Sequence, residues 1–450
     1  MHEMLPLIER SREDHIATRL RNKKTPNSQN LIVDVSEFLS DVIALADALP
    51  ERSFAINICN DRYYFLVSFI AVIVRGQCNL LPANKKIVTQ ERLSYRYSNC
   101  YVIHDGTLPL SDQLLNINCV PLLNGHNVSD QSISIATDQL SAMVFTSGST
   151  GDSKPSPKTW GMLYQSGTSG AQYYLPANHK VKHSLVATVP PQHMYGLETS
   201  ILLPLFADVC VANVQPFFPK DVADTLTCIA SPRILVTTPI HLKALLESRI
   251  DFPLIHVLLS ATAPLTQDTA RRAESRFGCQ IVEIYGCSET GSIAHRATAQ
   301  DAEWEAFDTF TFHQSSAITT VTANHFSLPI PLEDILEFSD HHRFQLVSRS
   351  ADAINIAGKR GSLDELNQLL LSTPGVLDGV IFATPGNDTG RPSALVVAPN
   401  LGKEEVLINL RNHVDALFVP KQIVFVDALP RSITGKLPMK DVLELYNSII

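Results

Sequence analysis

The sequence predicts a layered α/β fold with a large N-terminal domain and a small C-terminal α+β domain. Short apolar runs rich in β-branched residues alternate with helical patterns over most of the chain, and this pattern changes near Arg349. Strands that alternate with helices favour a mostly parallel sheet covered by helices. The length of 450 residues exceeds what one ordinary core uses, so two or three domains are expected.

The N-terminal part contains short runs that are typical of buried parallel strands. The run at 54–59 comes first, and 63–75 then has the length and composition of a buried helix. Further strands are expected over 142–146, 184–189, 209–214, 233–237, 255–260 and 280–284. Two of the helical patterns between them cover 239–248 and 265–277.

The C-terminal part has a different order of elements. Strands are expected over 317–321 and 343–347 with no helix between them. The elements expected beyond residue 349 are a helix at 363–371, strands at 376–383 and 394–398, a helix at 403–416 and a strand at 422–426. These last elements span about 100 residues, which is the size of a small domain. We therefore predict one domain over 1–349 and another over 350–450.

The composition limits the classes of function. The formal net charge of −9 argues against a broad nucleic-acid-binding face. The longest apolar stretch, 65–74, is about half a membrane span, and charged residues near the N-terminus argue against a signal peptide. Eight cysteines without a Cys-x-x-Cys pair suggest reduced thiols. We expect a cytoplasmic protein without a membrane span, either a monomer or a homodimer.

A segment rich in hydroxyl groups and glycine follows the expected strand at 142–146. Its glycines let the backbone turn tightly beside a ligand, and its hydroxyl and amide groups suit phosphate oxygens. A Walker-type P-loop is excluded, because Ser153 stands where that motif needs its second glycine. A flexible connector is the alternative, but the density of polar groups after a buried strand argues against it. The candidate phosphate-binding residues are Thr146, Ser147, Gly148, Ser149, Thr150, Gly151 and Lys154.

This segment resembles the Ser/Thr/Gly-rich loop of the adenylate-forming ligases. That superfamily comprises acyl-CoA synthetases, adenylation domains of non-ribosomal peptide synthetases and luciferases. Four further segments resemble its other motifs in the same order, so the resemblance extends over roughly residues 50–440. It implies a large ATP- and acid-binding domain and a small mobile domain that carries a catalytic lysine.

The segments at 190–196 and 283–291 resemble the next two motifs. In the first, His193, Tyr195 and Gly196 would lie beside the acyl group, although a structural loop is the alternative for this segment alone. The second resembles the signature Tyr-Gly-x-Thr/Ser-Glu at the end of a strand. An incidental glycine turn is its alternative. The candidate nucleotide-binding residues in it are Tyr285, Gly286, Ser288 and Thr290.

Three side chains of the second segment suit particular parts of ATP and its metal ion. Tyr285 offers a flat face for adenine, and the Thr290 hydroxyl suits the α-phosphate. Glu289 supplies a hard carboxylate oxygen for Mg²⁺. The resemblance gives Thr146, His193 and Glu289 catalytic roles.

The segment at 331–334, Pro-Leu-Glu-Asp, departs from the family's Tyr-x-Thr-Gly-Asp. Spacing nevertheless supports Asp334 as the residue that accepts hydrogen bonds from both ribose hydroxyls. The family has arginines 15 and 26 residues after this aspartate, and these offsets reach Arg349 and Arg360. Glu333 is a rival for the ribose role, and an exposed acidic loop is the remaining alternative.

The segment at 429–437 resembles the C-terminal motif Pro-x-x-x-x-Gly-Lys. Its lysine, Lys436, would bridge the carboxylate, the ribose and the α-phosphate while the acyl-adenylate forms. An exposed lysine after a glycine turn is the alternative. Relatives carry Asp or Lys at the pivot between the two domains, where this chain has Ala351. Gly361 likewise stands where an apolar residue is common, in the loop that lines the path of the thiol.

The resemblance implies ATP-dependent activation of a carboxylic acid with release of pyrophosphate. Mg²⁺ would assist, and the acyl group would pass to CoA or to the phosphopantetheine thiol of an acyl carrier protein. The acid should lie between His193, the turn formed by Ser260, Ala261 and Thr262, and Tyr285. These residues are small or aromatic and bring no charge for an amino group, so an aryl or fatty acid is expected.

Two features leave the acceptor and the activity open. The chain is short for the superfamily, which favours a carrier protein because such an acceptor needs no binding surface for the CoA nucleotide. A carrier is usually acidic, however, so its basic docking patch on this acidic chain must be local.

A catalytically degenerate relative that acts as a binding module is the alternative function, although Glu289 and Lys436 are retained. A kinase-like phosphotransferase would need a Walker lysine or a phosphoacceptor base, and the sequence offers neither.

Overall fold

The structure is a computed structural model that describes the following residues: 3–20, 30–123, 132–146, 154–175, 181–315, 318–349, 353–356, 359–383, 391–414, 416, 418–432, 435 and 437–450. The chain forms two compact units, Met1–Asp301 and Ala302–Ile450, which we call the first and second units. The predicted boundary between residues 349 and 350 lies inside the second unit and remains a prediction.

A six-stranded sheet with the order β10-β9-β5-β4-β6-β7 forms one half of the first unit. Its strands are β4 (Phe54–Asn57), β5 (Cys78–Leu81), β6 (Cys100–His104), β7 (Asn116–Asn118), β9 (Leu140–Thr146) and β10 (Lys154–Thr159). All neighbours are parallel except β9 and β10, which are antiparallel. The sequence predicted β4 and β9 but not β5, β6, β7 or β10. At β10, Lys-Pro-Ser-Pro-Lys-Thr lacks the apolar run of a buried strand.

The other main sheet of this unit has the strand order β16-β15-β14-β13-β11-β12-β2-β3. Its strands are β2 (His15–Arg19), β3 (Leu31–Asp34), β11 (His183–Ala187), β12 (Val209–Ala212), β13 (Arg233–Thr237), β14 (Val257–Ser260), β15 (Gln280–Cys287) and β16 (Gly291–Arg296). Its centre is parallel, and antiparallel pairs lie at both ends of this order. The predicted parallel strands are confirmed, while β2, β3 and β16 were missed. A short pair, β1 (Met4–Pro6) and β8 (Ser134–Ala136), completes the unit's strands among the described residues.

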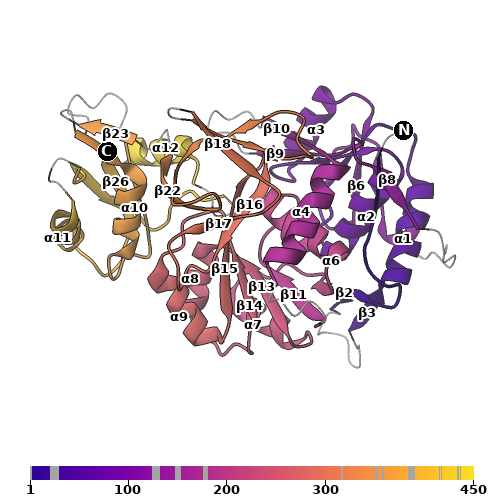
Figure 1. Ribbon diagram of the computed structural model, residues 1–450, viewed down its shortest axis with the longest axis horizontal. Coiled ribbons are helices and arrows are strands. Elements are labelled where there is room, and N and C mark those ends of the chain that lie inside the picture. Colours follow the sequence, from indigo (N-terminus) through magenta and orange to yellow (C-terminus); the bar gives the residue numbers. More distant parts are fainter. Residues whose placement is uncertain are drawn as a thin grey trace. The chain divides into compact units, whose positions relative to one another are not determined.

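Helices separate and cover the two sheets (Figure 1). The helical segments are α1 (Val35–Ala48), α2 (Arg62–Val74), α3 (Ile87–Arg96), η1 (Val120–Leu122), α4 (Trp160–Tyr173), α5 (Met194–Leu197), η2 (Glu198–Leu202), α6 (Leu203–Phe206), α7 (Pro219–Thr227), α8 (Pro239–Glu247) and α9 (Gln267–Phe277). Helix α2 contacts strands of both sheets, and α7, α8 and α9 share an apolar core with β11 to β15. Helix α3 packs through Leu93 onto the six-stranded sheet.

Arg62 is a buried charge at the start of α2. Its guanidinium donates to the carbonyl oxygens of Ala187 (3.1 Å) and Val189 (2.9 Å) and to the hydroxyl of Ser200. Burial lowers the pKa of Arg62 to about 9. Through these hydrogen bonds, the Arg62 side chain connects the start of α2 to the end of β11 and to η2. Helix α2 itself contacts strands of both sheets.

The second unit begins with two small antiparallel arrangements. One has the order β21-β22-β17 and the other β18-β19-β20. Their strands are β17 (Trp304–Ala306), β18 (Thr311–Ser315), β19 (Ile318–Thr322), β20 (Ile330–Pro331), β21 (Asp334–Phe338) and β22 (Arg343–Arg349). A hairpin follows, formed by β23 (Ala353–Ile356) and β24 (Lys359–Ser362). The predicted strands at 317–321 and 343–347 correspond to β19 and β22.

The C-terminal part of the second unit is a three-stranded sheet between helices. It comprises α10 (Leu363–Ser372), β25 (Asp378–Phe382), β26 (Ser393–Val397), α11 (Lys403–His413), β27 (Gln422–Phe425) and α12 (Met439–Ile449). Ile381 and Val396 face the core with α10 and α11, while Phe382 and Leu395 face α12. Side chains that alternate along a strand thus serve two helical layers. Every helix within the described ranges is too short or too polar to cross a membrane.

Replacement of Arg62 by methionine should lower the free energy of unfolding by about 3 kcal/mol. The variant would leave two buried carbonyl groups and one buried hydroxyl without their donor, and each such loss costs about 1–3 kcal/mol. Chemical denaturation measures this change. Arg75→Met is the matched control, because Arg75 is exposed at the other end of α2 and should change stability by about 0.5 kcal/mol or less. Equal stabilities of the two variants would refute the structural role of Arg62.

Candidate functional site

The hydroxyl-rich segment connects two adjacent strands of the six-stranded sheet. Strand β9 ends at Thr146, β10 begins at Lys154, and these two residues are paired in register. The expected phosphate-binding residues Ser147, Gly148, Ser149, Thr150 and Gly151 lie outside the described residues. Since β9 is parallel to β5, the connection starts at the carboxyl edge of the parallel strands, where α/β sheets bind ligands. Lys154 is exposed and belongs to β10.

The second nucleotide-binding candidate is the turn between β15 and β16. Tyr285 and Gly286 lie in β15, where the register with β16 shifts between them. A Cβ atom on Gly286 would lie 2.1 Å from the carbonyl oxygen of Gly291, so this close approach of two backbones requires glycine. The Thr290 hydroxyl accepts a hydrogen bond from the backbone N–H of Cys287 (3.3 Å), whereas Glu289 is exposed. The phosphate role of Thr290 and the metal role of Glu289 remain predictions.

Strand β10 holds this turn through two side chains. Ser156 donates its hydroxyl to the carbonyl oxygen of Ser288 (2.9 Å), and the ammonium of Lys158 donates to that of Glu289 (2.6 Å). Lys158 is buried, and desolvation lowers its pKa to about 8. Strand β10, which follows the hydroxyl-rich segment, is therefore joined to the turn that carries Glu289, although the bonded residues lie about 130 positions apart in sequence.

The expected acyl-binding block lies at the start of α5. The Tyr195 hydroxyl donates to the carbonyl oxygen of Thr237 at the end of β13 (3.0 Å), and burial raises the pKa of Tyr195. A Cβ atom on Gly196 would lie 2.0 Å from the carbonyl oxygen of Pro190, so the chain can fold back here only at a glycine. His193 directly precedes α5 and is half-buried.

A buried carboxylate ties this block to the turn after β15. Glu198 accepts hydrogen bonds from the backbone N–H (2.9 Å) and the hydroxyl (2.6 Å) of Ser292. Burial raises the pKa of Glu198, and its bonds to Ser292 and the charge of Lys158 act in the opposite direction. Gly291 has φ of +73°, and a Cβ atom there would lie 2.6 Å from Glu198 Oε1. The segments at 193–198 and 288–292 are thus fixed against each other.

The third acyl-binding candidate is the turn that follows β14. Ser260 ends β14 and is paired with Glu283 of β15. The Ser260 hydroxyl is buried and has no hydrogen-bond partner in the described part of the chain. Thr262 has φ of +82°, a left-handed conformation that is strained for a β-branched residue. A strained turn beside an unsatisfied hydroxyl is typical of a functional site, and it supports Ser260, Ala261 and Thr262 as acid-binding residues.

Glu283 belongs to the same motif as Tyr285 but has a structural role. Its carboxylate accepts hydrogen bonds from the backbone N–H of Leu265 (3.1 Å), the Thr298 hydroxyl (2.6 Å) and Arg296 Nε (2.8 Å). Burial raises the pKa of Glu283, while the charge of Arg296 opposes that shift. Glu283 therefore anchors the chain after the turn at 260–262.

The remaining predicted residues belong to the second unit. Asp334 begins β21 and is paired directly with Arg349 at the end of β22, so the antiparallel register brings these two candidates together. Arg360 lies in β24, paired with Asn355. Lys436 and Ala351 lie outside the described residues. The nucleotide contacts of Asp334, Arg349 and Arg360 remain predictions.

Arg431 anchors the residue that precedes Lys436. Its guanidinium forms two hydrogen bonds of 2.7 Å with the carboxylate of Asp378 and donates to the carbonyl oxygen of Gly435 (2.9 Å). Paired bonds between arginine and carboxylate have a fixed geometry. The structure thus reveals four buried or half-buried charges near site residues that motif comparison did not select: Lys158, Glu198, Arg431 and Asp378.

In the first unit, the carboxylate of Glu289 is the candidate ligand for a metal ion. Across the described ranges, no three His, Cys, Asp or Glu side chains gather into a metal-binding group. Mg²⁺ does not require such a group, because it binds through one or two carboxylates together with substrate phosphates. The exposed Glu289 fits that mode of binding.

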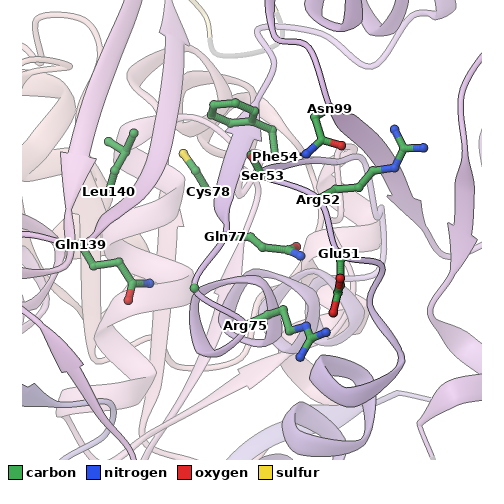
Figure 2. Close-up of a pocket in the computed structure, with 11 residues that line it drawn as sticks. Glu51, Arg52, Ser53, Phe54, Arg75, Gln77, Cys78, Asn99, Gln139 and Leu140 are labelled. Carbon is green, nitrogen blue, oxygen red and sulfur yellow. Dashed lines mark hydrogen bonds between the residues drawn. The ribbon is translucent and has the colours of Figure 1, made fainter.

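A separate cavity of about 620 Å³ lies at the opposite edge of the six-stranded sheet (Figure 2). Phe54, Cys78 and Leu140, the first residues of β4, β5 and β9, line it. Arg52, Gln77, Asn99 and Gln139 contribute polar groups, and the charged residues Glu51 and Arg75 also line the cavity. The cavity opens at the amino ends of these strands, whereas the hydroxyl-rich connection follows the carboxyl end of β9.

Comparison with known proteins agrees with this arrangement of motifs. A family model described as AMP-binding enzyme matches residues 70–312, more than half of the chain, and one described as AMP-binding enzyme C-terminal domain matches residues 365–436. The chain is 28% identical over 300 residues to the 4-coumarate–CoA ligase of Rhodobacter capsulatus, which covers 66% of this chain and 74% of the relative. It is 22% identical over 362 residues to the long-chain-fatty-acid–CoA ligase of Escherichia coli O157:H7, with coverages of 71% and 64%.

Solved structures show the same fold. ATP-bound MatB from Rhodopseudomonas palustris matches with a TM-score of 0.80 at 17% identity over 97% of both chains. The o-succinylbenzoate CoA synthetase MenE of Bacillus subtilis, in complex with ATP and magnesium ion, matches with a TM-score of 0.76 at 16% identity over 91% of this chain and 94% of that chain. The fold and the matching family models together show that the chain belongs to the AMP-binding enzymes, the adenylate-forming ligase superfamily.

Proposed function

We propose that this protein is an AMP-forming acid–thiol ligase. It activates an aryl or fatty carboxylic acid with ATP and then transfers the acyl group to a phosphopantetheine thiol, carried by an acyl carrier protein or by CoA. The observation that carries this proposal is the attachment of the turn at 288–289 to β10 by Ser156 and Lys158. It joins the strand that follows the expected phosphate-binding segment to the backbone of the turn that carries Glu289, whose carboxylate is suited to Mg²⁺.

The first step of the proposed reaction forms the acyl-adenylate. A carboxylate oxygen of the acid attacks the α-phosphorus of ATP, the bond to the bridging oxygen breaks, and pyrophosphate leaves. The protein contributes by positioning the reactants and neutralising charge. Residues 146–154 hold the β- and γ-phosphates, Asp334 holds the ribose, and Lys436 stabilises the charge that develops at the reacting centre. Mg²⁺ on Glu289 would neutralise phosphate charge.

The second step transfers the acyl group. The thiol sulfur attacks the acyl carbonyl carbon after losing its proton, and AMP leaves with the bonding electron pair. Rotation of the C-terminal domain about residues near 349 would exchange the groups that face the adenylate, a common form of hinge movement. The pivot residue is open, because Ala351 replaces the usual Asp or Lys.

The turn at 260–262 and the block at 193–196 support an acid without a positive charge. Tyr195, Gly196 and Ala261 are uncharged, and the Tyr195 hydroxyl is already bonded to a carbonyl oxygen. The nearby carboxylates Glu198 and Glu283 are bonded to Ser292 and to Arg296, respectively. No described acidic group of this region is therefore aimed at an amino group of a substrate, which favours aryl and fatty acids over amino acids.

The first prediction concerns activity and Lys436. The protein should catalyse carboxylate-dependent exchange between pyrophosphate and ATP with at least one acid from a panel of aryl and fatty acids. Lys436→Ala should slow that exchange by about 10²–10³-fold, the usual effect of losing one preorganised donor. Lys440→Ala is the matched control, because Lys440 is an exposed lysine of α12. No exchange with any acid would favour the alternative function, a catalytically degenerate binding module.

The second prediction concerns Lys158. Lys158→Met should free the carbonyl group of Glu289, shift the turn, and raise the Mg²⁺ concentration needed for half-maximal exchange by about tenfold, as loss of one charged hydrogen bond does. Titration of Mg²⁺ in the exchange assay measures this shift. The exposed Lys220→Met serves as control. A variant with lower activity but an unchanged Mg²⁺ requirement would show that Lys158 does not position Glu289.

The third prediction concerns Arg431. Arg431→Met should lower kcat of adenylation by about tenfold while leaving KM for ATP nearly unchanged, because the segment before Lys436 loses its anchor and ATP binding does not depend on it. The exposed Arg411→Met of α11 is the matched control. An increase in KM for ATP with an unchanged kcat would contradict this positioning role.

A further inference from the structure

Helix α3 presents an exposed face that combines apolar and basic side chains. Tyr95 is 94% exposed and Val88 is 57% exposed. Because Val88, Arg92 and Tyr95 are spaced by four and three residues, they form one ridge along the helix. The opposite side of α3 is buried through Gln90 and Leu93. Large side chains this exposed on a helix that is already anchored suggest a surface for a partner.

The charge on this face is positive although the whole chain is acidic. Lys86, Arg92 and Arg96 are all exposed. The side chains of Lys86 and Arg92 form no hydrogen bond or ion pair with any other described residue, and the Arg96 guanidinium lies 5.8 Å from the ring centre of Tyr97. Of the carboxylates nearest in sequence, Glu91 accepts a hydrogen bond from Ser111 (3.0 Å), Asp105 is buried and accepts from the backbone N–H groups of Asn60 and Asp61, and Asp112 is exposed. The chain as a whole has a formal net charge of −9, so this is a local basic patch.

The position of α3 relates the patch to the proposed reaction. Strand β5 runs parallel to β9, with Leu81 paired with Val144. The segment that leads from β5 to α3 therefore leaves the sheet at the same edge as the hydroxyl-rich connection after Thr146.

Helix α3 then runs back toward the amino ends of the strands, because β6 is parallel to β5 within this sheet. Helix α3 contacts β6, and its Leu93 lies in one apolar cluster with Phe145 of β9. A partner bound along α3 would therefore reach the edge at which the nucleotide is expected to bind through the start of the helix, beside Lys86 and Val88.

We propose that the α3 face, formed by Lys86, Val88, Arg92, Tyr95 and Arg96, docks an acidic acyl carrier protein whose phosphopantetheine thiol accepts the acyl group. This inference rests on the proposed function and selects the carrier protein over CoA as the acceptor. Charge complementarity decides the occupant: a carrier protein is small, helical and acidic, and basic rim residues raise the rate at which such a partner binds. Val88 and Tyr95 supply the apolar contacts that give a docked complex its lifetime.

The test compares two thiol acceptors with the full-length protein. The carrier is an acidic holo-acyl carrier protein of bacterial fatty-acid synthesis, and pantetheine is the uncharged small thiol. The charge-reversal variant Arg92→Glu/Arg96→Glu should raise KM for the carrier about tenfold or more. Its pyrophosphate exchange and its transfer to pantetheine should equal those of the wild type. Tyr95→Ser should weaken transfer to the carrier in the same selective way.

A matched control carries the same change of charge elsewhere on the first unit. Lys220→Glu/Arg272→Glu replaces exposed residues of α7 and α9 and should leave KM for the carrier unchanged. Transfer by the wild type should also weaken with rising salt for the carrier but not for pantetheine, because only the former depends on charge.

Three results would overturn the docking proposal while leaving the ligase function intact. The first is an equal KM for the carrier in the α3 variant and in the control. The second is transfer by the wild type to CoA but never to the carrier. The third is a dimer that the wild type forms and the α3 variant does not, which would assign the face to a second copy. Absence of pyrophosphate exchange with every acid would instead remove the proposed function itself, and the docking proposal with it.

Discussion

The buried contact between Lys158 and the carbonyl oxygen of Glu289 is the interaction on which the site of the first unit depends. Lys158 belongs to the six-stranded sheet, whereas Glu289 follows a strand of the other sheet. An ammonium group loses its hydration when it is buried, and the lowered pKa of Lys158 reflects that cost. Its hydrogen bond and the charge of Glu198 offset this cost, so the lysine keeps one position and fixes the turn.

The same physical arrangement recurs around the other motifs. A charged side chain that is buried or half-buried forms hydrogen bonds to the backbone of a segment near candidate site residues. Glu198 holds Ser292, Glu283 holds Leu265, and Arg62 holds the end of β11. In the second unit, Arg431 holds Gly435, the residue before Lys436. Positions fixed in this way are valuable for phosphoryl transfer, where catalysis is mainly positioning.

Glycine has a corresponding role where backbones meet. Gly196 and Gly286 allow carbonyl oxygens to approach to distances that any side chain would block, and Gly291 makes room for the Glu198 carboxylate. These contacts explain why the sequence motifs contain glycine at fixed positions. They also show that the expected acyl-binding block and the turn after β15 form one packed arrangement in the first unit, rather than two separate loops.

The sequence by itself determined the α/β class, most parallel strands and the order of the motifs, because apolar periodicity and turn residues are local properties. Resemblance to the motifs of the adenylate-forming ligases selected the candidates Glu289 and Lys436, and the spacing of that family supported Asp334. Sequence-based prediction missed several strands, β10 among them, and the anchoring charges Lys158, Glu198 and Arg431. Their partners lie far away in the chain, about 130 residues for Lys158, 94 for Glu198 and 53 for Arg431 with Asp378. A buried charge is stable only beside its partners, so only the tertiary structure could decide that these residues are buried and what they hold.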